Sequence, residues 1–495
     1  MNNILKKIGA VCCSLMLLSS CSETYLDTIP TDSYSESFMF ENAENAMIAL
    51  NGIHRSMYKQ YGSMNRAGYS SLMIGVDALG EDFVLPSTGW WVSQAKWEEH
   101  TDPNSPWNEW VYSFLYATIR NSNAIINQID GLSGDAKFKN QIKGEALTYR
   151  ALSHFWLVQL YGKRYSSETL NEQTVPLMLE VTLDPQPMST VKAVYDQVLA
   201  DFKAAEELLK EGTPGVYNKS HFSVAVVQGW LARYYLTIKD WTNASSYAVK
   251  AIASAKAGGA KLMDQADYKK GFSDASNPEW LWSSLVRADQ TLYFYSYFAF
   301  VSYNFSSTNI RTCPKVMNNN IYNEISDTDV RKWCWVPNPT ATTFPLPTSS
   351  FKRYPYMNRK FAVLDQSSSV GDVPNMRLAE LYLIDAEAKA NLGQGSAADV
   401  LFELMKARDT EAVKSTKTGD ALLQDILVQR RIELWGEGFR FLDLKRLGLP
   451  LNREDSNNDP VVVVTMKVPA NSNKWLWQFP QTEINANPNI VQNPL

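Results

Sequence analysis

The chain has 495 residues, enough for two or three average domains or one large one, and 45% of them are apolar against 20% charged. This composition is typical of a globular protein and excludes a disordered one. The formal charge is −5 and no basic run is present. A nucleic-acid partner is therefore excluded, because neutralising phosphates requires clustered Lys and Arg.

The N-terminus has the order of a secretory signal. Lys6 and Lys7 precede an apolar run over residues 8–18, which is shorter than the roughly 20 residues of a membrane-spanning helix. The run ends in Leu18-Ser19-Ser20-Cys21, which resembles the bacterial lipobox, where the cysteine is acylated and becomes the new N-terminus. We expect residues 1–20 to be removed and the body to be held to a membrane by lipid on Cys21. An ordinary signal peptide with an incidental cysteine is the alternative.

Apolar residues at helical spacing predict a mainly α-helical body. The predicted helices cover residues 41–58, 110–132, 141–161, 191–209 and 223–255, the last with a break near residues 239–241. Residues 62–106 are predicted to be rich in loops, and residues 258–375 to be mostly irregular with short strands. Residues 461–464 are predicted to form a strand.

Two stretches match the tetratricopeptide repeat, in which small residues let paired helices approach closely. The first match consists of Ala232, Tyr235, Trp241, Ala244, Ala248 and Ala251. The second covers residues 381–407, with Ala386 and Ala398 twelve positions apart and Gly393 at the turn. Two unrelated helical hairpins are the alternative.

No cofactor is expected. Of the five cysteines, only Cys313 and Cys334 lie beyond the lipidation point, and the sequence leaves open whether they form a disulfide or are both free. The sequence contains no C-x-x-C pair, so it does not indicate a structural zinc site. The four histidines are scattered along the chain. Residues 455–459 begin like a calcium loop, but Pro460 stands where the sharp-turn glycine belongs.

One group of charges has the residue types of a glycosidase site. Glu433 and Glu437 are four residues apart on a predicted helix, close enough for a pair of catalytic carboxylates. Arginines surround them in the sequence, and paired arginines would hold both carboxylates ionised, with no proton to donate. We therefore interpret the group as a structural ion-pair network, and no other catalytic motif is present.

Aromatic residues in polar or irregular segments remain as candidates for ligand binding. Trp and Tyr rings offer rigid apolar platforms, and sugars present flat C–H faces to such rings. Core packing or contact with a partner protein is the alternative for each of them. The candidate ligand-binding residues are Trp90, Trp91, Tyr293, Tyr295, Trp333 and Trp335.

Several segments, in order along nearly the whole chain, resemble the SusD/RagB family of surface lipoproteins from nutrient-uptake systems of Bacteroidetes-type bacteria. Residues 21–30, 49–53 and 191–205 are similar to that family's early motifs. More specific are PNMRLAELYLIDAEA at residues 374–388, RRIELWGEGFRFLDLKR at 430–446 and FPQTEI at 479–484. Pro187-Met188, where the family usually has an arginine, departs from the pattern.

The resemblance implies about four tetratricopeptide-like helix pairs that support an irregular, loop-rich lobe. It divides one structural unit into an N-terminal part over residues 21–257 and a C-terminal part over residues 258–495. It also implies a lipid-anchored protein at the surface of the outer membrane that captures an oligosaccharide for a SusC-like TonB-dependent transporter. A peptide-binding lid resembling RagB, a scaffold without ligand and a surface glycosidase are the alternatives.

Overall fold

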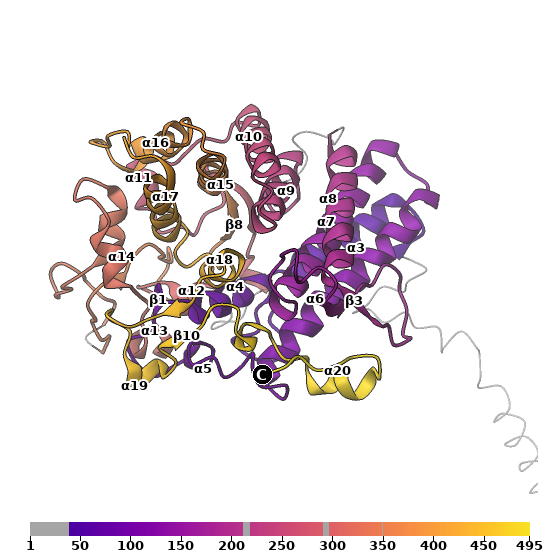
Figure 1. Ribbon diagram of the computed structural model, residues 1–495, viewed down its shortest axis with the longest axis horizontal. Coiled ribbons are helices and arrows are strands. Elements are labelled where there is room, and N and C mark those ends of the chain that lie inside the picture. The colour runs from indigo at the N-terminus through magenta and orange to yellow at the C-terminus, as the bar shows by residue number, and fades with distance from the viewer. Residues whose placement is uncertain (1–38, 211–217, 291–296, 349) are drawn as a thin grey trace, which may run out of the picture.

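The computed structural model describes residues 39–210, 218–290, 297–348 and 350–495, and within these ranges helices far outnumber strands (Figure 1). The longer helices are α3 (Ala43–Ser56), α4 (Gly68–Leu79), α6 (Pro106–Gln128), α7 (Ala136–Tyr161), α8 (Val191–Leu209), α9 (Val224–Thr237), α10 (Trp241–Ala257), α15 (Leu378–Asn391), α16 (Ala397–Arg408), α17 (Gly419–Glu433) and α18 (Arg440–Leu447). The shorter ones are α5 (Val92–Ala95), α11 (Gln265–Tyr268), α12 (Phe298–Val301), α13 (Thr308–Thr312), α14 (Asn319–Asn323), α19 (Pro460–Val463) and α20 (Gln481–Ala486). The prediction of a mainly helical body is confirmed.

The helix starts follow ordinary capping chemistry. The Ser105 side chain accepts a hydrogen bond from the backbone N–H of Asn108 at 3.1 Å, and Pro106 opens α6. The Thr190 hydroxyl accepts from the N–H of Ala193 at 3.1 Å, so α8 begins at residue 191, as predicted. These bonds satisfy N–H groups that have no partner within the helix.

The scaffold is a run of helices packed each against the next. α6 packs on α7, α7 on α8, α8 on α9 and α9 on α10, and α10 then packs on α15, which contacts α16 and α17. In Figure 1 this run extends from α6 and α7 on the right, through α9 and α10, to α15, α16 and α17 on the left. Fully buried alanines such as Ala232, Ala248 and Ala386 let the helices approach closely. The tetratricopeptide-like arrangement is therefore confirmed.

The described ranges contain four small antiparallel sheets, two of which join segments distant in the sequence. One has the order β1 (Phe83–Val84), β5 (Val316–Met317), β7 (Met357–Asn358) and β6 (Trp335–Val336). The others are two-stranded and pair β2 (Gln173–Pro176) with β3 (Met188–Thr190), β4 (Trp280–Ser284) with β8 (Val373–Arg377), and β9 (Leu451–Asn452) with β10 (Lys467–Val468). Because Val84 pairs with Val316 in antiparallel register, the loop that leaves β1 lies beside the segment that enters β5.

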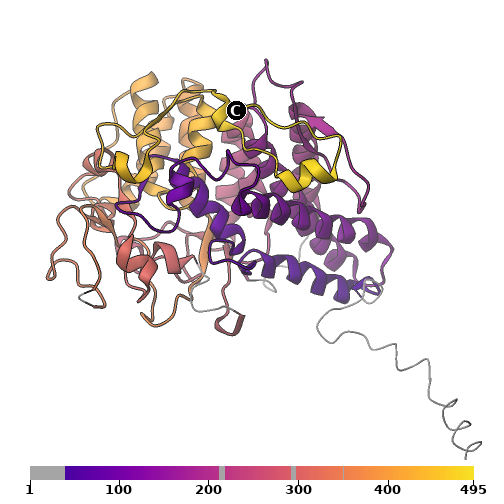
Figure 2. The ribbon, with the colours of Figure 1, turned by 90° about the horizontal axis from the view of Figure 1, so that it is seen from below.

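The two halves of the chain share one buried apolar cluster, which takes residues from α3 to the C-terminal segment. That final segment crosses back over the N-terminal helices (Figure 2). There the N–H of Gln478 donates to the carbonyl of His100 at 2.8 Å, and the N–H of Gln481 donates to that of Pro103 at 2.8 Å.

In two segments the structure differs from the prediction. Residues 62–106 contain α4, a helix in which all twelve residues are buried. A Cβ on its Gly75 would lie 2.2 Å from the Trp107 ring, so only glycine allows this approach. Residues 460–463 form the helical turn α19 instead of a strand, because the Asp459 side chain caps it by accepting from the N–H of Val461.

Cys313 and Cys334 are both buried free thiols. The Cys313 Sγ donates to the carbonyl of Ser87 at 3.0 Å and so ties α13 to the loop that follows β1. Burial raises the pKa of the Cys334 thiol to about 12.

Candidate ligand-binding site

The loop between β1 and α5 carries two neighbouring tryptophans that differ in exposure. Trp91 has a φ of +79°, a left-handed conformation that is uncommon for a residue with a side chain. Trp90 is 37% exposed, whereas Trp91 is 2% exposed. The Trp91 ring packs edge to face on Phe300, with centroids 5.3 Å apart, and this packing holds the strained turn.

An open groove of about 490 Å³ lies in front of these tryptophans. Its walls come from the Trp90 loop and from α13, which the β1–β5 pairing and the Cys313–Ser87 hydrogen bond bring together. Figure 1 shows α5 and α13 on the same side of the molecule. The residues that line the groove are Asn65, Gly89, Trp90, Trp91, Ser93, Gln94, Glu99, Thr308, Asn309 and Thr312.

Two buried hydrogen-bond donors in this lining have no partner among the described residues. They are the indole Nε1 of Trp91 and the amide Nδ2 of Asn309, and both atoms are buried. A buried donor without a partner costs about 1–3 kcal/mol, so such groups in native proteins call for an explanation. Both donors lie beneath the groove surface, so a ligand hydroxyl or carbonyl oxygen reaches them only if the side chains around them shift, while the apolar face of the ligand rests on Trp90.

The structure separates two of the other predicted binding residues, Trp333 and Trp335, from this groove. Trp335 is 1% exposed and packs edge to face on Trp435, so it has no free face to offer and is corrected to a core residue. Trp333 is half-buried, and the Arg359 guanidinium lies 4.1 Å from its ring centroid. Neither residue lines the groove. Tyr293, Tyr295 and Cys21 lie outside the described residues.

Asn309 is one of the groove residues that the sequence did not single out. It lies in the short helix α13, in a polar context that resembles many surface loops. Its importance comes from the β1–β5 pairing, which no local pattern in the sequence indicates.

Glu433 and Glu437 belong to a buried ionic cluster. Glu433 contacts Arg377 at 2.9 Å and Arg408 at 3.0 Å, while Glu437 contacts Arg377 and Lys360 at 2.7 Å each. Burial by itself would raise the pKa of both carboxyls, but the neighbouring cations more than offset it and hold the pKa of Glu433 well below its ordinary value. Two ionised carboxylates provide no general acid, in agreement with a structural role.

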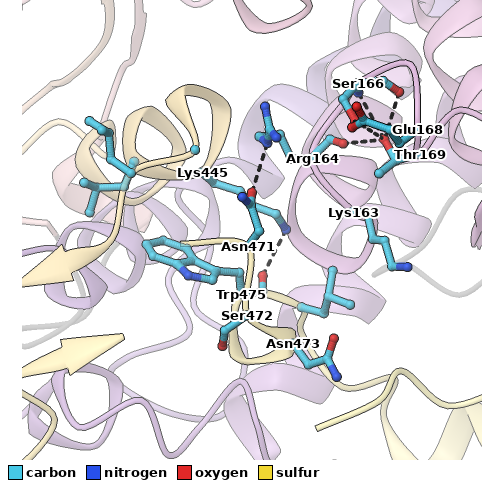
Figure 3. Close-up of a pocket in the computed structure, with 14 residues that line it drawn as sticks. Lys163, Arg164, Ser166, Glu168, Thr169, Lys445, Asn471, Ser472, Asn473 and Trp475 are labelled. Atoms are coloured by element: carbon cyan, nitrogen blue, oxygen red, sulfur yellow. Dashed lines mark hydrogen bonds between the residues drawn. The ribbon is translucent and has the colours of Figure 1, made fainter. Parts of the chain in front are cut away.

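A second cavity of about 230 Å³ lies between the end of α7, α18 and the C-terminal segment (Figure 3). Burial lowers the pKa of its Lys445 to about 7. The Lys445 Nζ donates to the carbonyls of Gln159 at 2.6 Å, Trp475 at 2.9 Å and Leu160 at 3.3 Å, so its donors are already used. Trp475 is buried, which leaves this cavity without an exposed aromatic platform.

Comparison with known proteins gives consistent matches over nearly the whole chain. The family model described as SusD family matches residues 233–495, and the one described as starch-binding associating with outer membrane matches residues 24–236. A SusD-like carbohydrate binding protein from Bacteroides vulgatus is 26% identical, with a TM-score of 0.77 over 91% of this chain and 98% of its own.

Two further proteins agree with this assignment. A SusD superfamily protein from Bacteroides thetaiotaomicron is 25% identical, with a TM-score of 0.78 over 92% of this chain and 100% of its own. SusD-like protein P2 from Formosa agariphila is 25% identical over 68% of this chain and 70% of its own. The chain therefore belongs to the SusD family.

Proposed function

We propose that this protein is a surface lipoprotein of the outer membrane that captures an oligosaccharide in the Trp90 groove and passes it to a SusC-like TonB-dependent transporter. The observation that carries the proposal is the exposed Trp90 ring beside two buried donors, Trp91 Nε1 and Asn309 Nδ2, that have no partner among the described residues. The function is binding and release, without a chemical step.

The groove suits a sugar for a physical reason. A pyranose ring has an apolar C–H face and a rim of hydroxyls, and Trp90 with the two donors matches this division. The groove is open and has one exposed tryptophan, so the contact area is modest and binding is reversible. Reversible capture is what transfer to a transporter requires, because a tightly held ligand would not be released.

The comparisons support the ligand class and the location. The Bacteroides vulgatus relative is described as a carbohydrate binding protein, and the family matched by the N-terminal half is described as starch-binding and associated with the outer membrane. In the described part of the chain, no helix is long and apolar enough to cross a membrane. In our proposal the attachment is the lipid on Cys21 instead.

Calorimetric titration of the body from Ser22 onward tests the ligand class. The titrants are plant, microbial and host oligosaccharides of graded length and, separately, a mixed peptide pool. We expect heat of binding from at least one oligosaccharide family and none from the peptides. A response to peptides alone would replace the sugar with a peptide ligand, and a response to neither would leave a scaffold that binds nothing.

Anchoring and partnership are tested in cells. Cys21→Ser removes the acylated thiol, so the expected result is loss of the lipid-modified N-terminal peptide in mass spectrometry and release from the outer-membrane fraction. Affinity purification of the unsubstituted lipoprotein, solubilised in mild detergent, is expected to retain a TonB-dependent barrel. Membrane retention of Cys21→Ser would contradict the anchor, and purification without a barrel would contradict the partnership.

A further inference from the structure

Three side chains from separate parts of the chain converge inside the helical scaffold, away from the groove. His54 comes from the last turn of α3, Glu145 from α7, and His221 from the segment that leads into α9. Glu145 is fully buried, and the exposed fractions of His54 and His221 side chains are 7% and 10%. Among the described residues, this is the group of three metal-ligating side chains whose donor atoms all lie within 4.8 Å of one another.

The distances within the group suit a tetrahedral metal ion. His54 Nε2 lies 3.2 Å from Glu145 Oε2, and His221 Nδ1 lies 3.1 Å from the same oxygen. A zinc ion holds nitrogen and oxygen ligands at about 2.0–2.2 Å, which places neighbouring ligand atoms about 3.3 Å apart in a tetrahedron. Two imidazoles and one carboxylate form a donor set that zinc accepts in proteins.

The hydrogen bonds around His54 point to the same conclusion. Its Nδ1 lies 2.6 Å from the Tyr149 hydroxyl. This contact holds the ring in place, as an outer hydrogen-bond partner, one that does not itself bind the metal, orients a metal-binding histidine. Its Nε2 is buried and makes no aligned hydrogen bond to a described residue, although the Glu145 carboxylate is close. A buried ring nitrogen in this state is costly, and a cation along its lone-pair direction would remove the cost.

We propose that His54, Glu145 and His221 form a binding site for a divalent transition-metal ion of the zinc type, with a fourth position left for water. The ion would join α3 to α7 and to the segment entering α9, so its effect is on the stability of the scaffold. The site is independent of the proposed sugar binding, because none of its residues lines the groove.

The test uses the tag-free body from Ser22 onward, stripped with a chelator and titrated with zinc chloride. We expect one ion bound per chain and a rise in the melting temperature of the apoprotein on adding zinc. Cobalt chloride is expected to give the visible absorption bands of a tetrahedral complex. Absence of stoichiometric zinc binding, or an octahedral cobalt spectrum, would overturn the proposal and leave the three groups as a metal-free ionic contact.

Variants assign the site to these residues. His221→Ala removes the most exposed ligand and is expected to weaken zinc binding at least 100-fold. Tyr149→Phe keeps all three ligands and removes the outer partner, so a loss of about 10- to 100-fold is expected. The control is His154→Gln, a buried histidine outside the cluster, which should leave zinc affinity unchanged. Equal affinity in His221→Ala would overturn the assignment, and if that variant fails to fold, the cobalt spectrum of the unsubstituted protein decides.

Discussion

The ring of Trp90 meets the ring of Phe300 edge to face, with centroids 6.0 Å apart and planes inclined at 66°. Phe300 belongs to α12, in the lobe that follows the central repeats, and its ring also packs on the ring of Trp91. The exposed platform of the groove is therefore fixed by a residue more than 200 positions away in the chain. A braced ring loses little conformational freedom when it stacks on a ligand.

Replacing Phe300 with leucine is expected to weaken oligosaccharide binding by about two- to tenfold. The substitution keeps an apolar side chain but removes the aromatic edge contact, which contributes about 0.5–1.5 kcal/mol. Calorimetric titration measures the change. The matched control is Phe298→Leu, which alters a buried phenylalanine of the same helix that has no ring contact with Trp90. Equal losses in the two variants would show a general loosening of the lobe instead of loss of the brace.

Asn309→Ala is expected to weaken binding by about two- to tenfold without lowering stability. The amide Nδ2 has no described protein partner to lose, so the substitution removes a hydrogen bond that forms only with the ligand, worth about 0.5–1.5 kcal/mol. Asn391→Ala, at an exposed position at the end of α15, is the control and should bind normally. Unchanged affinity in Asn309→Ala would remove this residue from the site.

Glu433→Gln is expected to lower the free energy of unfolding by about 3–5 kcal/mol, measured by chemical denaturation at neutral pH. The change leaves the buried guanidinium groups of Arg377 and Arg408 without part of their counter-charge. The control is Glu403→Gln, which breaks an exposed pair with Lys406 and should cost less than about 1 kcal/mol. A loss of similar size in both variants would contradict the structural role of the cluster.

The protein is expected to lose stability as the pH falls from about 6.5 towards 3. Burial lowers the pKa of His100 and of His154 to about 3, whereas an unfolded histidine titrates near 6.5. Below 6.5 the unfolded chain binds protons that the folded protein does not, so the contribution of each histidine is full above 6.5 and is lost as the pH falls. Each group contributes a slope of up to about 1.4 kcal/mol per pH unit.

Denaturant titrations at several pH values between 3 and 7 check this dependence. Replacing His154 with glutamine should flatten the slope, since one of the two groups no longer titrates, even if the variant is less stable throughout. If the free energy of unfolding of His154→Gln changes with pH as steeply as that of the unsubstituted protein, His154 does not contribute to the pH dependence.

The amphipathic helix α8 was predictable, and the fully buried helix α4 was not. α8 starts and ends where its apolar spacing predicts, because one face is buried and the other is exposed to solvent. α4 was missed because all of its residues are buried, so no period appears. The valines after Pro460 are β-branched and favour a strand by their intrinsic propensity. Over so short a segment, the hydrogen bond by which Asp459 caps the helical turn outweighs that propensity.

The binding groove was predictable only in part. The polar loop around Trp90 indicated an exposed ring, and the structure exposes that ring. Trp335 also lies in an irregular segment of the sequence, but in the structure it belongs to β6, which pairs with β7. Its ring packs edge to face on the ring of Trp435 and is buried there. Asn309 and the metal-ligating trio come together through long-range packing, and sequence spacing contains no trace of either arrangement.

The central claim is that Trp90 is the stacking platform for a sugar, and a paired calorimetric titration tests it most directly. The oligosaccharide that binds the unsubstituted body best is titrated into Trp90→Ala and into Trp333→Ala, a half-buried tryptophan outside the groove. The account predicts at least about tenfold weaker binding in Trp90→Ala, equal to about 1.4 kcal/mol, and unchanged binding in Trp333→Ala. Full affinity in Trp90→Ala, or a loss confined to Trp333→Ala, would contradict it.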